Sequence, residues 1–174
     1  MTFAERDPSL RAGPDVTARP PRFRYEESVL ALIRNPGARD YLSRRGLPTG
    51  NPLFFPVAAY THAGEGREFV VIGHDGTGLY CVDVVTGEVV ITSLEVEDGI
   101  GHVNASPQAF DRCITEFVRG LPYGRRDSER EDLESMSENV GHVLSGIDSS
   151  VFDDDPGFWP TLLNDVAIGD YVAD

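Results

Sequence analysis

The sequence predicts an α+β fold in which an antiparallel β-meander is flanked by helices toward both ends of the chain. Three observations support this fold class. Short β-rich runs between Phe69 and Thr92 are separated by glycine-containing turns. Segments with helical periodicity lie before and after this stretch, so helices and strands are segregated along the chain. The 174 residues, 40% of them hydrophobic, suffice for one hydrophobic core.

The meander is predicted from three strands, at residues 69–73, 79–84 and 89–92, joined by turns at residues 74–78 and 85–88. The central strand is expected to be covered on both sides, because both of its faces are largely apolar. Residues 101–104 are expected to add a short strand. Alternation in the central strand places Leu79, Cys81 and Asp83 on one face and Tyr80, Val82 and Val84 on the other.

Before the meander, we expect a flexible tail over residues 1–21, followed by a single folded domain over residues 22–174. A helix is predicted from Tyr25 to the stop at Asn35-Pro36, with Leu32 on its inward face. A second short helix is predicted from Ala38 to Arg45, ending at Gly46.

The segment between these helices and the meander is harder to assign. Leu47-Pro48 is expected to open a loop. Residues 53–60 are apolar but contain Pro56, which predicts an edge strand or an irregular extended segment. Residues 61–66 are expected to form a polar loop.

After the meander, three helical segments are predicted. Ser106-Pro107 provides an N-cap followed by a first-turn proline for a helix that ends at Gly120. A more polar helix is expected over residues 125–147, and Asp153–Pro156 is expected to open a last segment that Gly169 ends. The expected apolar residues are Phe110, Cys113, Ile114, Phe117 and Val118 in the first helix, Leu133, Met136, Val140 and Leu144 in the second, and Phe158, Trp159, Leu162, Leu163 and Val166 in the third.

The charge of the chain is strongly acidic and unevenly distributed. Residues 1–52 hold nine Arg and six Asp/Glu, for a net charge of +3, whereas residues 53–174 hold six Arg and 23 Asp/Glu, for −17. Such a field disfavours binding to nucleic acid or to an anionic membrane and favours a basic partner. No apolar run is long enough to cross a bilayer, and the N-terminus lacks the pattern of a secretory signal. We therefore expect a cytoplasmic protein.

Residues with catalytic or metal-binding chemistry do not form a recognisable motif. The four histidines lack metal-ligand spacing, and Cys81 and Cys113 are expected to be buried free thiols. Turn geometry sufficiently explains His74-Asp75, and favourable charges at a helix N-terminus explain Asp153–Asp155. We therefore expect no catalytic residues, no metal and no cofactor.

The order and spacing of several motifs resemble the SUKH superfamily, and its fourth subfamily of bacterial immunity proteins most closely. The resemblance extends from about Tyr25 to Tyr171, with the polar helix of residues 125–147 as its weakest part. The motifs are the strand ending at Ile72-Gly73, the Thr86-Gly87 turn, the Val103–Ser106 step into an aromatic-bearing helix, the approach Gly46–Pro48, and the ending Phe158-Trp159 to Tyr171.

The resemblance implies a protein that neutralises a cognate bacterial toxin by direct binding, without catalysis. Toxins in such systems include nucleases and nucleic-acid deaminases, which are often basic, so an acidic inhibitor suits them. A general interaction module with a non-toxin partner is the alternative, and a hydrolase or nucleotide-modifying enzyme is the least favoured. The residues expected to contact the partner lie in loops at the ends of the sheet: Glu65, Asp75, Glu95, Glu97 and Asp98.

Overall fold

The computed structural model describes residues 21–93 and 99–173, and the predicted tail at residues 1–21 lies outside this range except for Pro21. The strands are β1 (Arg22–Phe23), β2 (Leu47–Pro48), β3 (Phe55–Gly64), β4 (Arg67–His74), β5 (Gly78–Asp83), β6 (Val89–Ser93) and β7 (Ile100–Asn104). The helices are α1 (Glu27–Leu30), α2 (Pro36–Asp40), α3 (Pro107–Gly120), α4 (Arg130–Ile147) and α5 (Phe158–Ile168), with a π-helical turn Tyr41–Arg45 and a 3-10 turn Ser149–Phe152. None of the helices in the described ranges has the length and hydrophobicity that a membrane span requires.

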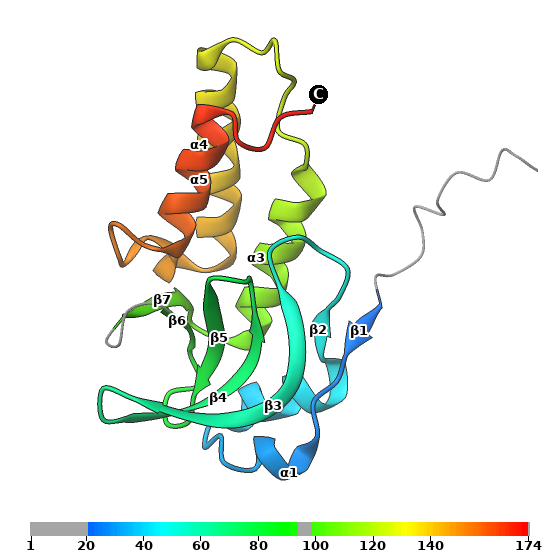
Figure 1. Cartoon of the computed structure of the whole chain (residues 1–174), viewed down its shortest axis with the longest axis vertical. Helices are drawn as coiled ribbons and strands as arrows, with labels where there is room; N and C mark the ends of the chain where they lie inside the picture. The colour runs from blue at the N-terminus through cyan, green and yellow to red at the C-terminus, as the bar shows by residue number, and fades with distance from the viewer. Residues whose placement is uncertain (1–20, 94–98, 174) are drawn as a thin grey trace, which may run out of the picture.

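Five strands form one antiparallel sheet in the order β3-β4-β5-β6-β7, which confirms the α+β class and the predicted meander. The predicted extra strand is β7, paired with β6. The short sheet β1-β2 replaces the loop that Leu47-Pro48 was expected to open. Figure 1 shows the five-stranded sheet in the lower half of the molecule and the pair α4 and α5 above it.

The β3–β4 hairpin is longer than the sequence predicts. The prediction of a loop at residues 61–66 is wrong, because pairing continues to Gly64 and Arg67 around the two-residue turn Glu65-Gly66. Both turn residues have positive φ, 51° and 72°, the conformation of a tight hairpin turn that matches the twist of the strands. The edge position predicted from Pro56 is confirmed, and an irregularity in pairing follows that proline.

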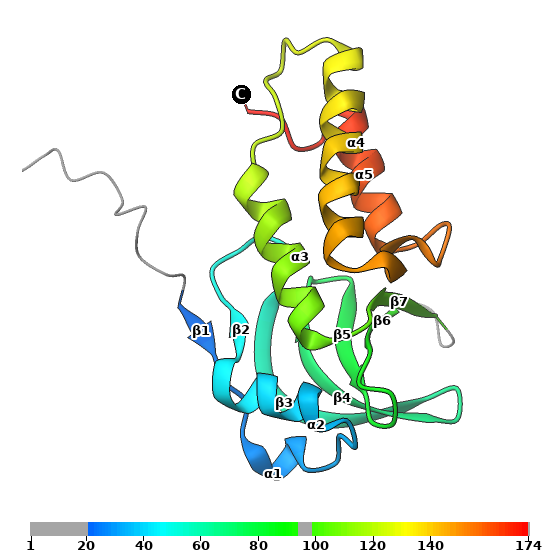
Figure 2. The same cartoon turned by 180° about the vertical axis from the view of Figure 1, so that it is seen from behind.

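The two faces of the sheet bury different cores. The face with Tyr80, Val82 and Val84 joins the main core under the helices, and α3 crosses this side of the sheet in Figure 2. The opposite face buries a smaller cluster of Phe69, Val71, Cys81 and Val90. The predicted alternation in β5 is therefore confirmed.

Within the described residues no helix packs against the smaller cluster; the sheet curves around it. Val57 from β3 and Ile100 from β7, at opposite edges of the sheet, both pack against it. A Cβ on Gly64 would lie only 3.9 Å from Ile100 Cδ1. The two edges therefore approach each other on this side, as the curved strands of Figure 1 show.

The N-terminal helix is shorter than predicted. It ends at Leu30, because the backbone hydrogen bonds of the following residues do not continue the α-helical pattern. The amide of Arg34 instead donates to the carbonyl of Val84 at 2.7 Å. Leu32 is 48% exposed, so its predicted inward position is wrong. The second helix continues as a π-helical turn and ends at Gly46, as predicted. Gly46 has φ 71°, and any Cβ there would clash with the carbonyl oxygen of Phe23.

The C-terminal helices pack closely on one another. α4 begins at Arg130 instead of residue 125, because Tyr123 and Arg126 donate backbone bonds to Tyr171 and Ala173. Its most buried positions include Ser137 and Gly141 in addition to the predicted Leu133 and Leu144, whereas Met136 and Val140 are partly buried. Small residues allow this approach, since Ser137 Oγ donates to the carbonyl of Leu163 in α5 at 2.7 Å.

The last helix begins later than predicted. It runs from Phe158, with Gly157 as its N-cap, so Asp153–Asp155 precede it and do not cap it. Trp159 is almost fully buried, which confirms that it docks α5 on the core, and Gly169 ends the helix in the left-handed conformation.

Candidate functional site

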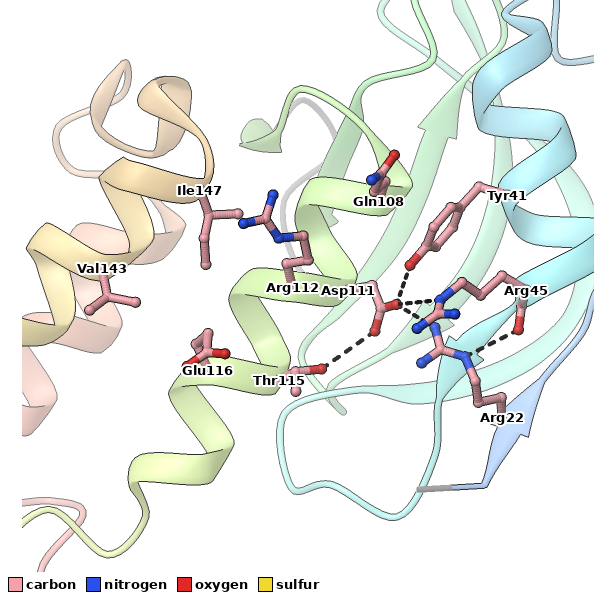
Figure 3. Close-up of a pocket in the computed structure, with 10 residues that line it drawn as sticks. All are labelled: Arg22, Tyr41, Arg45, Gln108, Asp111, Arg112, Thr115, Glu116, Val143 and Ile147. Atoms are coloured by element: carbon pink, nitrogen blue, oxygen red, sulfur yellow. Dashed lines mark hydrogen bonds and ion pairs between the residues drawn. The ribbon is translucent and has the colours of Figure 1, made fainter. Parts of the chain in front are cut away.

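One concave surface of the described residues is a groove between the N-terminal region and the C-terminal helices (Figure 3). Its volume is about 790 Å³. β1 and the π-helical turn form one wall, α3 forms the floor, and α4 provides an apolar wall. The residues that line it are Arg22, Tyr41, Arg45, Gln108, Asp111, Arg112, Thr115, Glu116, Val143 and Ile147.

Asp111 is the centre of this groove. Its carboxylate is buried and accepts hydrogen bonds from the Arg22 guanidinium and the Tyr41 hydroxyl. Arg45 Nε lies 4.0 Å from Asp111 Oδ2, and Thr115 Oγ1 donates to Oδ1 at 3.4 Å. Because Arg22 is 89 positions away in the sequence, this contact fastens the start of the described chain to α3.

The same contacts determine what Asp111 can do chemically. Arg22 also donates to the carbonyl of Gly46 at 2.6 Å and, through Nε, to that of Arg45 at 3.1 Å. Burial, followed by the Asp111 carboxylate, raises the pKa of the Tyr41 hydroxyl, so it stays protonated and acts as a donor. With both carboxylate oxygens engaged, Asp111 organises the groove and is poorly placed to take a proton from a substrate.

Arg112 differs from the other two arginines of the groove. It is exposed, and within the described ranges it forms neither a hydrogen bond nor an ion pair. In Figure 3 its guanidinium points away from Asp111. Val143 on the facing helix is 49% exposed. The groove therefore combines cationic and apolar surface.

A second buried carboxylate lies at the junction of β7, α3 and the C-terminal helices. Asp148 Oδ2 accepts from Asn104 Nδ2 at 2.8 Å and from the amide of Ala105 at 2.9 Å, while Oδ1 accepts from the Ser150 hydroxyl at 2.7 Å. Trp159 Nε1 donates to the backbone carbonyl of Val103 at 3.1 Å and to Asn104 Oδ1 at 3.2 Å. The network joins α5 to the sheet.

Hydrogen bonding determines the charge state of this group. Burial acts to raise the pKa of Asp148, but hydrogen bonds from Ser150, Asn104 and Ala105 outweigh it and lower the pKa below the ordinary aspartate value. Asp83 behaves in the same way. Burial acts to raise its pKa, yet bonds from the amides of Thr86 and Val85 and from Arg67 lower it.

The structure places two of the five predicted contact residues, at opposite ends of the sheet. Glu65 is exposed in the β3–β4 turn. Asp75 is in the β4–β5 turn, half-buried, where its Oδ1 accepts from the amides of Thr77 and Gly78 at 2.8 Å. The turn geometry inferred for Asp75 is thus observed. Glu95, Glu97 and Asp98 lie outside the described residues.

Other candidate groups are inert or dispersed. Cys81 and Cys113 are buried free thiols, as predicted, and burial raises the pKa of each to about 12. Among the residues that the structure describes, no three His, Cys, Asp or Glu side chains are grouped as a metal site would require.

Sequence reasoning missed both carboxylate centres, Asp111 and Asp148. A weak signal existed for Asp111, since it lies one position after Phe110, at the border of the apolar stripe of α3. For Asp148 the signal was Asn104, a polar residue directly after an apolar strand and before the helix cap.

Comparison with known proteins agrees with the fold and the resemblance. No curated protein and no solved structure matches the chain. Residues 13–165, most of the chain, match the family described as SUKH-4 immunity protein, so the chain belongs to the SUKH-4 family of toxin-neutralising immunity proteins.

Proposed function

We propose that this chain is a non-catalytic immunity protein that binds a cognate toxin domain in the cytoplasm and blocks it by direct contact. The family match over residues 13–165 is the observation that carries this proposal. The chemistry of the buried carboxylates supports it. Asp83, Asp111 and Asp148 are each engaged by several donors, and such groups hold a structure together.

The proposed partner is a basic toxin domain, such as a nuclease or a nucleic-acid deaminase. Residues 53–174 have a net charge of −17, and residues 127–170 alone contain 12 Asp/Glu and one Arg. Complementary fields raise the rate of association, and an acidic protein can cover a cleft that otherwise attracts nucleic acid. Binding to nucleic acid or to a membrane has no role in this proposal.

We propose contact through the acidic turns at the ends of the sheet, with Glu65, Asp75, Glu95, Glu97 and Asp98 as contributors. Of the two that the structure describes, the exposed Glu65 is more accessible than the half-buried Asp75. These residues act mainly through long-range attraction, so their removal should slow association more than it speeds dissociation.

The test uses the toxin encoded beside this gene. The two proteins should co-purify, and expression of this chain should protect cells that express the toxin. Failure of both would contradict the proposal. Charge reversal of Glu95, Glu97 and Asp98 together should slow association and flatten its salt dependence. Reversal of the exposed Glu129, Glu131 and Asp132 at the start of α4 is the matched control, with the same change in net charge.

A further inference from the structure

One edge of the five-stranded sheet is open. β3 pairs with β4 on one side only, and no other segment in residues 21–93 and 99–173 forms backbone hydrogen bonds with residues 57–64. The half of β3 beyond the irregularity at Pro56 is regular, with Tyr60 to Gly64 paired residue by residue with Val71 to Arg67. This half has the geometry of a strand that can accept another strand.

The turn determines which backbone groups face outward. Gly64 and Arg67 close a two-residue turn, so they form the first hydrogen-bonded pair, and bonded and non-bonded pairs then alternate. The backbone N–H and C=O groups of His62 are directed toward β4, whereas those of Thr61 and Ala63 are directed away from the sheet. Glu68 lies opposite Ala63, and its carbonyl accepts from the amide of Val84 in the direction of β5. The backbone groups of this pair therefore point away from each other, as the alternation requires.

The side chains of this edge do not protect it. Proteins usually protect an open edge with charged residues, proline or a covering segment. The ten residues of β3 include no Asp, Glu, Lys or Arg, although a quarter of the chain is charged, and Pro56 lies at the opposite end. Tyr60 is 46% exposed on this strand.

The surroundings indicate the chemistry of the missing strand. Glu65 and Glu68 are exposed at the tip of the hairpin and form no ion pair within the described residues, whereas Arg67 is paired with Asp83 at 2.8 Å. Beside Thr61 and Ala63 lies a hollow of about 350 Å³, with Leu32 and Val84 among its apolar residues. An extended segment with alternating apolar side chains and a basic residue near Glu65 and Glu68 complements this edge in backbone, shape and charge.

We propose that the open edge of β3, residues 60–64, binds an extended segment of the toxin as a sixth strand of the sheet. This inference rests on the proposed function and specifies how the partner is held. Backbone hydrogen bonds at Thr61 and Ala63 provide affinity, the hollow at Leu32 takes an apolar side chain, and Glu65 with Glu68 takes a basic one.

The first measurement is hydrogen exchange of the wild-type protein, free and bound to the purified toxin. The amides of Thr61 and Ala63 should exchange rapidly in the free protein and slow by about tenfold or more in the complex. The amide of His62, already bonded to β4, should change less. An interface made of side chains alone would not produce this alternation.

The second measurement is toxin affinity of Ala63→Pro, which removes an outward N–H without removing a bond to β4. Affinity should fall about tenfold or more, since tenfold corresponds to ~1.4 kcal/mol, about one hydrogen bond. Ala63→Val keeps the N–H and changes only the side chain, so its loss of affinity should be clearly smaller than that of Ala63→Pro; equal losses would contradict a role of the N–H. A thermal unfolding curve of each variant checks that it folds.

The outcomes separate the two proposals. If the wild-type protein binds the toxin but Thr61 and Ala63 are not protected and Ala63→Pro binds normally, the edge-strand inference is wrong and the immunity function stands. If the wild-type protein does not bind the toxin, both are wrong. If the free protein sediments as a dimer that Ala63→Pro dissociates, the edge pairs with a second copy, and the assignment to the toxin is overturned.

Discussion

The two edges of the sheet are built in opposite ways. The amide of His102 in β7 donates to Asp154 Oδ2 at 2.9 Å, and the His102 ring is 2.8 Å from Ser150 Oγ, so the C-terminal segment covers this edge. At β3, ten residues without Asp, Glu, Lys or Arg form the other edge, and no described segment forms backbone hydrogen bonds with residues 57–64. Among the described residues, the C-terminal segment covers the β7 edge and the backbone of β3 is unpaired on its outer side, so a further strand can be added at β3 only.

Trp159 should matter most for the covered edge. Trp159→Ala should lower the free energy of unfolding by about 3–5 kcal/mol, because it removes a buried ring and its bonds to β7. Denaturant unfolding measures the loss. Ile168→Ala on the same helix, where the side chain is 61% exposed, should change it by less than about 0.5 kcal/mol. Equal losses would show that α5 is not anchored through Trp159.

Asp148 should rank next. Asp148→Ala leaves the donors of Asn104, Ala105 and Ser150 without their acceptor, so the free energy of unfolding should fall by about 2–4 kcal/mol. Chemical denaturation at neutral pH measures it. The control is Asp155→Ala, at an exposed aspartate on the same segment. If Asp148→Ala lowered the free energy of unfolding by less than this control, Asp148 would not be the stabilising acceptor of these donors.

Acid should weaken the same edge. The pKa of Asp148 is lower in the folded protein than the value near 3.9 of an unfolded chain, so its contribution is complete above that value. The contribution is lost as the pH falls through the folded pKa. Unfolding in urea from pH 7 to pH 3 should show a less steep acid loss for Asp148→Asn than for the wild type. Asp83, whose pKa is also lowered, contributes to the slope that remains.

Two prolines should distinguish the sides of β3. His62→Pro removes a bond to β4 and should cost about 2–3 kcal/mol beyond the cost of His62→Ala. Ala63→Pro, one residue later, should stay within about 1 kcal/mol of the wild type, since its N–H is directed outward. Thermal or urea unfolding measures both. Similar losses at the two positions would mean that the backbone groups of Thr61 and Ala63 are not directed outward.

Asp154 should have the smallest effect. Asp154→Ala uncovers the His102 amide and should cost about 1 kcal/mol, typical for one exposed hydrogen bond to a carboxylate. The informative readout is hydrogen exchange, in which the His102 amide should accelerate while the neighbouring Val103 amide changes less. Asp155→Ala should leave both amides unchanged, because Asp155 forms no hydrogen bond with β7 within the described residues.

The sequence predicted what neighbouring residues determine. Alternation in β5 and the turn glycines define the meander, and Ser106-Pro107 defines the start of α3. The end of β3 was missed because Thr61 to Gly64 lack an apolar pattern and depend on a turn that closes tightly at Glu65-Gly66. Leu32 was misplaced because the α1 helix ends where the amide of Arg34 bonds to a strand far along the chain.

The carboxylate centres could not be predicted for a related reason. Asp111 meets Arg22 across 89 positions and Asp148 meets Asn104 across 44, so neither pairing leaves a local pattern. Of the five acidic contact residues inferred from the loops, the structure describes Glu65 and Asp75, which lie at opposite ends of β4.

The two cysteines lie in different cores, Cys81 in the small cluster and Cys113 under the helices. Only a thiolate reacts rapidly, and burial keeps both thiols protonated and out of contact with solvent. The labelling rate of each thiol therefore reports on the opening of its own side of the sheet. The time at which a thiol reagent labels Cys81 records when the curved sheet opens, and labelling of Cys113 records when the helices separate from it.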